Sequence, residues 1–220
     1  ICNNFMRHMF DYRKYTEIKE YINVSEKNTK IIAISKNHPK TSVLQAISHG
    51  VREFGENRVQ EAKEKFNDIL PDYPNLSLHL TGPLQTNKVK QSLKLFSYFH
   101  TLDREKLAIE FSKNNELIKD KKFFIQVNTG REINKSGIFL ENLDSFYTFC
   151  KEEIKLNVIG LMCIPPIDES PKEHFKILKE AGRKFNLENY SMGMSGDYIE
   201  AVDLNSTYIR LGTVLFGKRK

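Results

Sequence analysis

A lysine follows an apolar run near the start of the chain. In the stretch KIIAISKNHPK, residues 31–34 are typical of a buried strand, and Lys36 stands two residues beyond it. Lysine is strongly hydrated and is rarely buried without a partner or a task. At the rim of an apolar pocket it loses hydration, which favours the neutral amine that forms a Schiff base with a carbonyl. The alternative is a side chain that only reaches solvent from the strand end.

Two segments near the C-terminus, GMSGD and RLGT, contain residues that can surround an anion with N–H and hydroxyl groups. Ser195, Gly212 and Thr213 are therefore candidates for a phosphate site, unless the glycines only shape turns. Arg210 lies in an apolar run, where its guanidinium needs acceptors. A Schiff-base lysine, a phosphate site and a donor for a ring nitrogen together describe a site for pyridoxal 5′-phosphate (PLP). The alternative for Arg210 is a structural salt bridge to a carboxylate such as Glu56.

Eight short β-branched or aromatic runs alternate with helix-like segments, and the candidate residues lie near the ends of these runs. The runs are 30–35, 51–55, 76–82, 97–103, 122–128, 156–163, 190–195 and 207–212. This alternation predicts an α/β fold, a single-domain (β/α)8 TIM barrel over residues 1–220, with an open doubly wound sheet as the alternative. In such barrels functional groups collect at the carboxyl ends of the strands.

Capping signals predict where some of the helices begin and end. Thr41 or Ser42 is expected to cap a helix that Gly50 ends, and Ser170 with Glu173 forms a predicted capping box.

The C-terminus leaves no room for a full eighth helix, because only three residues follow Gly217. Residues 10–28 have a helical pattern and belong to an N-terminal segment, 1–29. We expect this segment to pack on the barrel in place of the missing helix.

The composition argues against several classes of function. The 220 residues are 40% hydrophobic and 28% charged, and no apolar run approaches the roughly 20 residues that span a bilayer. Three widely spaced cysteines, and six histidines without metal-binding spacing, predict no metal site and a reducing, cytoplasmic location. The net charge of +6 is spread along the chain, which favours a solvated basic surface over a nucleic-acid partner.

Eight motifs follow one another in order between residues 30 and 217. They are ISK (34–36), FGENRVQE (54–61), HLTGPLQTNK (79–88), HTLD (100–103), KSG (135–137), GLM (160–162), GMS (193–195) and RLGTVLFG (210–217). In these motifs the chain resembles the PLP homeostasis protein family, the YggS or PROSC group. The resemblance implies a barrel like the N-terminal domain of alanine racemase.

The resemblance also implies roles for individual residues. The residues expected to bind PLP are Lys36, Asn57, Met162, Ser195, Arg210, Gly212 and Thr213. Lys36 would carry the Schiff base, Arg210 would face the pyridine nitrogen, and the three phosphate candidates would keep that role. Lys135, in the KSG motif, is a weaker candidate for transient contact with PLP.

Two positions depart from the family pattern. The family often has two acidic residues after GMS, whereas here Gly196 precedes Asp197, and it usually has Gly where this chain has Asn205. Both departures are expected next to the phosphate site.

The family is not credited with an established catalytic reaction, and its members are thought to bind, buffer or deliver PLP. Racemisation usually needs acid/base groups on both faces of the substrate, and only Lys36 is recognised here. An always-protonated arginine at the ring nitrogen also weakens the ring as an electron sink. We therefore expect an intracellular PLP homeostasis protein rather than an enzyme, a monomer or weak dimer, with PLP-dependent apoenzymes as candidate recipients. The alternatives are a PLP-dependent racemase-type enzyme and a Schiff-base aldolase without PLP.

Overall fold

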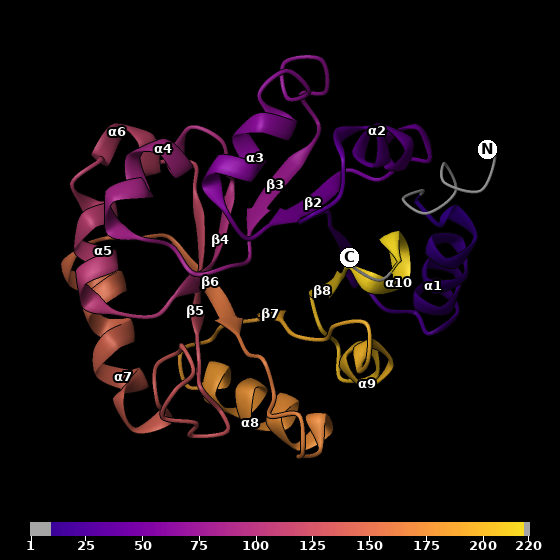
Figure 1. Cartoon of the computed structure of the whole chain (residues 1–220). Helices are drawn as coiled ribbons and strands as arrows, with labels where there is room; N and C mark the ends of the chain where they lie inside the picture. The colour runs from indigo at the N-terminus through magenta and orange to yellow at the C-terminus, as the bar shows by residue number, and fades with distance from the viewer. Residues whose placement is uncertain (1–9, 218–220) are drawn as a thin grey trace.

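The computed structural model describes residues 10–217 and contains, within them, eight parallel strands closed into a barrel in sequence order (Figure 1). The strands are β1 Lys30–Ile34, β2 Glu53–Glu56, β3 Ser77–Leu80, β4 Tyr98–Leu102, β5 Lys122–Gln126, β6 Val158–Met162, β7 Asn189–Ser191 and β8 Tyr208–Leu211. Each strand lies in or overlaps one of the eight predicted runs. The barrel prediction is confirmed, and the open sheet is excluded because β1 also pairs with β8.

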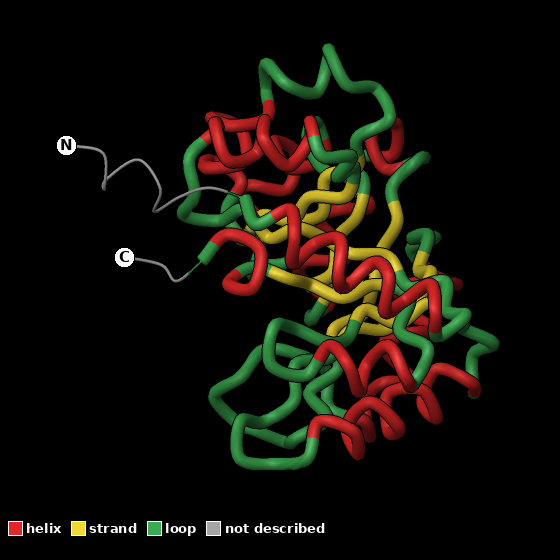
Figure 2. The backbone as a smooth tube through the Cα atoms, turned by 90° about the vertical axis from the view of Figure 1, so that its right-hand side faces the viewer, coloured by secondary structure: helices red, strands yellow, loops and turns green. Residues whose placement is uncertain are grey.

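Helices surround the strands, which occupy the middle of the molecule in Figure 2. The α-helices are α1 Tyr12–Val24, α2 Lys40–Ser48, α3 Val59–Phe66, α4 Val89–Leu93, α5 Glu105–Ser112, α6 Asn115–Ile118, α7 Leu140–Thr148, α8 Pro171–Arg183, α9 Tyr198–Asp203 and α10 Thr213–Phe216. A 3-10 turn, η2 Thr86–Lys88, precedes α4, and a π-helical turn, η3 Phe149–Glu153, follows α7.

The strands separate two apolar layers. In β1, Ile32 and Ile34 belong to a cluster inside the barrel, whereas Ile31 and Ala33 belong to the larger cluster between the strands and the helices. This alternation follows from the two-residue period of a strand. It explains why β1 is apolar almost throughout.

The N-terminal helix α1 packs against the barrel. Ile18 and Ile22 of α1 are buried, and Figure 1 shows α1 beside the short α10. The backbone N–H of Asp11 donates to the carbonyl of Leu215 over 2.8 Å. Of the expected segment 1–29, residues 1–9 lie outside the described residues.

Two of the predicted helix caps differ from the structure. Helix α2 begins at Lys40, so Thr41 and Ser42 lie inside its first turn, because Pro39 already holds the extended conformation that precedes a helix. Ser170 does precede α8, but its side chain makes no capping hydrogen bond, and the Glu173 carboxylate pairs with Lys176 instead. Gly50, with φ of 86°, ends α2 as predicted.

Two cysteines in the described residues are free thiols inside the protein, Cys150 and Cys163. Burial raises the pKa of each thiol to about 12. Because the thiolate is the reactive form, we expect iodoacetamide at pH 8 to modify neither residue in the native protein and both in urea, as read by peptide mass mapping. Labelling of Cys163 at the same rate in both conditions would show that the barrel opens at this point.

Candidate functional site

A cavity of about 270 Å³ opens at the carboxyl ends of the strands and collects most of the predicted binding residues. Six of the seven line it, namely Lys36, Asn57, Ser195, Arg210, Gly212 and Thr213. They come from the ends of β1, β2 and β8 and from the loop after β7. Residues far apart in the sequence meet here because parallel strands of a closed barrel all end on the same face.

Met162 is the predicted residue that does not line this cavity. It is the last residue of β6, is fully buried, and packs in the interior cluster with Ile34 and Tyr208. Ile34 itself lines the cavity. The role of Met162 at the cofactor therefore stays a prediction.

The charge of the cavity favours an anion. Among its described lining residues, Lys36 and Arg210 are basic and none is acidic. Asn57, Thr81, Ser195 and Thr213 add neutral hydrogen-bonding groups, and Thr81 Oγ1 donates to Asn57 Oδ1 over 3.0 Å.

Arg210 is held by two neutral acceptors. Its Nη1 donates to Ser191 Oγ over 2.8 Å, and its Nη2 donates to the carbonyl of Cys163 over 2.9 Å. Burial lowers the pKa of the guanidinium, although arginine stays protonated at any ordinary pH. The predicted alternative, a salt bridge to Glu56, is wrong, because Glu56 pairs with Lys65.

The phosphate candidates lie on two neighbouring loops. Gly212 precedes α10, and its carbonyl accepts from two N–H groups in the first turn of that helix. The N–H of Val214 donates to Ser195 Oγ over 3.4 Å, which ties the β7 loop to this turn. Asp197 accepts from the N–H of Met194 over 2.5 Å and so shapes the β7 loop.

The two departures from the family pattern lie at opposite ends of the barrel, since Gly196 is in the loop after β7 and Asn205 precedes β8. Gly196 lines the cavity, and a Cβ there would meet no atom within 4 Å. Asn205 precedes β8, whereas Gly212 follows it. The expectation that Asn205 lies beside the phosphate site is therefore wrong. Its φ of 57° is left-handed, a conformation that Gly adopts freely and Asn tolerates.

A buried charge cluster beside Lys36 was not predicted. Lys65 Nζ lies 2.7 Å from Glu56 Oε1 and 2.8 Å from Glu61 Oε1, and donates to the carbonyl of Ser35 over 2.6 Å. Ser35 Oγ donates to Glu56 Oε1 over 2.6 Å, and the N–H of Asn37 donates to Glu61. The residues on both sides of Lys36 are thus fixed to β2 and α3.

One signal for this cluster was visible in the sequence. Glu61 and Lys65 are four residues apart, a spacing that pairs side chains on a helix. Burial, opposed by Lys65, raises the pKa of Glu56 to about 7. The sequence did not indicate that α3 would turn Lys65 inward, where only 6% of the residue is exposed.

Lys135 lies outside the first cavity. It lines a neighbouring cavity of about 310 Å³ and pairs with Glu132 over 3.3 Å. Asn57, Thr81 and Ile164 line both cavities, so the two are adjacent.

Comparison with known proteins gives the family. A family model of the alanine racemase N-terminal domain matches residues 13–220. A pyridoxal phosphate homeostasis protein of Aquifex aeolicus is 38% identical over 207 residues, covering 89% of each chain. The chain belongs to the pyridoxal phosphate homeostasis protein family. Another member, from Vibrio cholerae, is 34% identical over 203 residues, covering 87% of this chain and 86% of that protein.

Solved structures of this family have the same fold. PipY of Synechococcus elongatus without PLP gives a TM-score of 0.84 at 32% identity, and PipY with PLP bound gives 0.81 at 31%. Each comparison covers 94% of this chain and 99% of PipY. An alanine racemase of Clostridium difficile gives 0.72 at 13% identity, over 57% of the racemase, which shows the fold alone.

Two general features follow from the described residues. No helix among residues 10–217 is long and apolar enough to cross a membrane. In the same range, no group of three His, Cys, Asp or Glu side chains is arranged to hold a metal ion.

Proposed function

We propose that this protein binds PLP in the cavity at the carboxyl ends of the strands and serves PLP homeostasis without a robust reaction of its own. The observation that carries the proposal is the meeting of Lys36, Arg210 and the phosphate candidates in one cavity whose described lining has no carboxylate. The family relationship supports it, since PipY, 31% identical, is known with PLP bound.

The residues present suit this cofactor. When bound, PLP supplies an aldehyde that a primary amine captures with loss of water, a doubly charged phosphate, and a ring nitrogen. In our proposal Lys36 provides the amine, Ser195, Gly212 and Thr213 hold the phosphate, and Arg210 donates to the ring nitrogen. Asn57 lies beside the cofactor, and Met162 supports it from the barrel interior.

A titration tests this proposal. Purified protein, freed of cofactor, is mixed with increasing PLP while its absorption spectrum is recorded. We expect saturable binding of one PLP per chain, with an absorption band that free PLP lacks. A spectrum equal to the sum of protein and free PLP would contradict the proposal and would leave a Schiff-base aldolase as the hypothesis to test.

The composition of the cavity does not favour the racemase alternative. Apart from Lys36, its described lining has no His, Tyr, Cys, Asp or Glu that could act as a second acid or base. Loss of amino-acid chirality, with uptake of deuterium from D₂O, would contradict our interpretation.

We further propose the setting in which the protein works. A single barrel domain over residues 1–220, as a monomer or weak dimer in the cytoplasm, would hold PLP and release it to PLP-dependent apoenzymes. The position of the cavity at the carboxyl ends of the strands, on one face of the barrel, supports exchange with partners or solvent.

The phosphate site gives a prediction with an internal control. Ser195→Ala and Thr213→Val each remove a hydroxyl next to the phosphate, and a hydrogen bond to a charged group is worth about 1.5–3 kcal/mol. We expect each variant to bind PLP roughly tenfold or more weakly, and to bind pyridoxal, which lacks the phosphate, as the unmodified protein does. An equal loss of affinity for PLP and for pyridoxal would show that the phosphate binds elsewhere.

A further inference from the structure

A network of hydrogen bonds crosses the interior of the barrel from β2 to Arg210. Glu53 Oε2 lies 2.8 Å from His79 Nε2, His79 Nδ1 lies 2.9 Å from His100 Nε2, and His100 Nδ1 lies 2.7 Å from Ser191 Oγ. Ser191 Oγ then accepts from Arg210 Nη1. We call these five residues the interior network.

The carboxylate at one end, together with two neutral histidines, fixes the direction of every bond in the interior network. Arginine can only donate and a carboxylate can only accept. Ser191 therefore donates its hydroxyl proton to His100 Nδ1, His100 donates from Nε2 to His79 Nδ1, and His79 donates from Nε2 to Glu53. Both histidines are neutral in this arrangement, which agrees with the burial that lowers the pKa of each.

Packing holds the two imidazole rings in place. His79 stacks on Tyr98 with ring centroids 4.3 Å apart, and His100 stacks on Phe124 at 4.5 Å. His79, His100 and Ser191 are fully buried. The interior network is therefore a single, fixed chain of hydrogen bonds between the Arg210 guanidinium and the Glu53 carboxylate.

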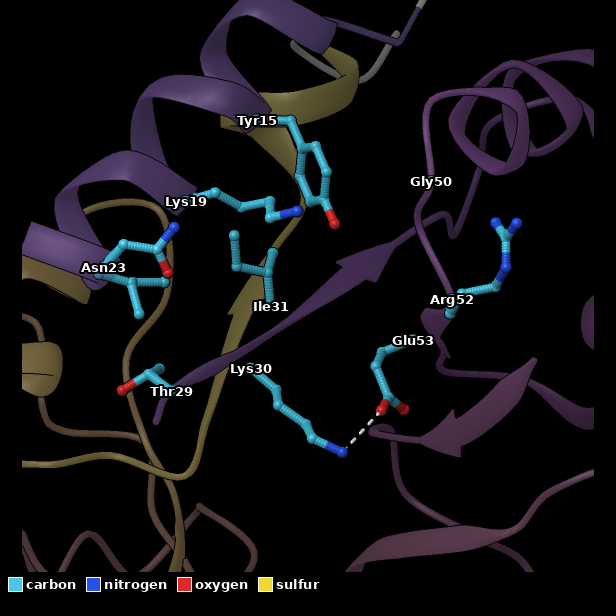
Figure 3. A pocket seen from close by; sticks show the side chains of 10 residues that line it. Tyr15, Lys19, Asn23, Thr29, Lys30, Ile31, Gly50, Arg52 and Glu53 are labelled. Carbon is cyan, nitrogen blue, oxygen red and sulfur yellow. Dashed lines mark hydrogen bonds and ion pairs between the residues drawn. The ribbon is translucent and has the colours of Figure 1, made fainter. Parts of the chain in front are cut away.

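The far end of the interior network opens on another cavity, at the amino ends of the strands. This cavity, of about 250 Å³, lies between α1 and the starts of β1 and β2. Figure 3 shows Lys30 reaching toward Glu53, with Lys19 of α1 and Arg52 also at the wall. Lys30 Nζ lies 3.2 Å from Glu53 Oε1, and the Glu53 side chain is 18% exposed. The carboxylate thus meets solvent at the face opposite the proposed PLP site.

We infer that His79, His100 and Ser191 are positioning residues that transmit the charge of Glu53 to Arg210, so that a group at one face of the barrel influences PLP bound at the other. This inference rests on the proposed function. The bonds to Ser191 and Cys163 set the plane of the guanidinium and so the direction of its remaining N–H groups. Hydrogen bonds in a row polarise one another. The negative charge of Glu53 therefore strengthens the hydrogen bond from Arg210 to Ser191.

A double-mutant cycle tests the inference. PLP affinity and the absorption maximum of bound PLP are measured for the unmodified protein, Glu53→Gln, Ser191→Ala and the double variant. Glu53→Gln keeps an acceptor for His79 but removes the charge. We expect each single variant to weaken PLP binding roughly three- to tenfold and to shift the absorption maximum, and the double variant to match Ser191→Ala, because coupled residues are not additive.

His174→Gln is the matched control. His174 is buried and lies 2.9 Å from the carboxylate of Glu169 through Nε2 and 3.0 Å from Thr129 through Nδ1, outside the interior network. Its substitution is expected to leave the spectrum and affinity unchanged. Circular dichroism verifies that each variant is folded.

The outcomes separate the two proposals. If the unmodified protein binds PLP but Glu53→Gln has the same spectrum and affinity, or if the two losses simply add, the inference is overturned while the proposed function stands. If the unmodified protein does not bind PLP, the proposed function fails and this inference fails with it.

Discussion

Replacing Lys36 with alanine is expected to weaken PLP binding by about 100-fold and to remove the absorption band of the bound cofactor. The substitution removes both the proposed attachment point and one of the two cations among the described residues that line the cavity. A loss of 100-fold corresponds to about 2.7 kcal/mol. Weak binding should persist, because Arg210 and the phosphate candidates remain.

The matched control for this variant is Lys40→Ala. Lys40 follows Lys36 by four residues but lies outside the cavity and pairs with Asp68 over 3.0 Å. It is expected to bind PLP as the unmodified protein does. If Lys36→Ala retained the full affinity and the band, or if both variants lost them alike, the assignment of Lys36 would be wrong.

Replacing Lys65 with methionine is expected to destabilise the protein by about 3–5 kcal/mol at pH 8. Methionine keeps the side chain as far as its fourth atom but leaves Glu56, which is fully buried, without its cation. Removal of one partner of a buried pair typically costs this much, because the other charge stays buried. Lys63→Met, at an exposed position of the same helix, should change the free energy of unfolding by less than about 0.5 kcal/mol.

The stability that Lys65→Met loses relative to the unmodified protein should depend on pH. Burial raises the pKa of Glu56 from 4.5 to about 7, and Lys65 opposes this rise, so the variant raises the pKa further. A carboxyl with a raised pKa in the folded state stabilises folding while protonated, and this contribution is lost as the pH rises through the folded pKa. Urea unfolding should therefore show a smaller deficit at pH 5 than at pH 8.

A double variant verifies the cause. Glu56→Gln together with Lys65→Met removes both charges, and most of the stability lost at pH 8 should return. An equal deficit at both pH values, or a double variant no more stable than Lys65→Met, would contradict the role given to Glu56.

The strands and the cavity were predictable because their signals are local. A short β-branched run such as residues 31–34 is typical of a strand whatever its neighbours, and the barrel then places the residues after each strand on one face. Lys36, Ser195 and Thr213 needed no knowledge of side-chain packing. The helix caps were less predictable, since Pro39 decides where α2 begins and no capping bond forms at Ser170.

The contacts of Arg210 and Lys65 could not be predicted in the same way. Glu53 begins β2, His79 lies in β3, His100 in β4 and Ser191 in β7. Only closure of the barrel brings these residues within hydrogen-bond distance of one another. Nothing in the motifs HLTG and HTLD indicates that the two histidines meet. The sequence suggested Glu56 as a partner for Arg210, but the inward-facing Lys65 takes that carboxylate.

The most direct test of the central claim is to locate PLP on the chain. The protein is incubated with PLP, reduced with borohydride, digested and analysed by mass spectrometry. We predict a single pyridoxyl group, on Lys36. A pyridoxyl group on another lysine such as Lys135, or no modified peptide at saturating PLP, would contradict the account of the site.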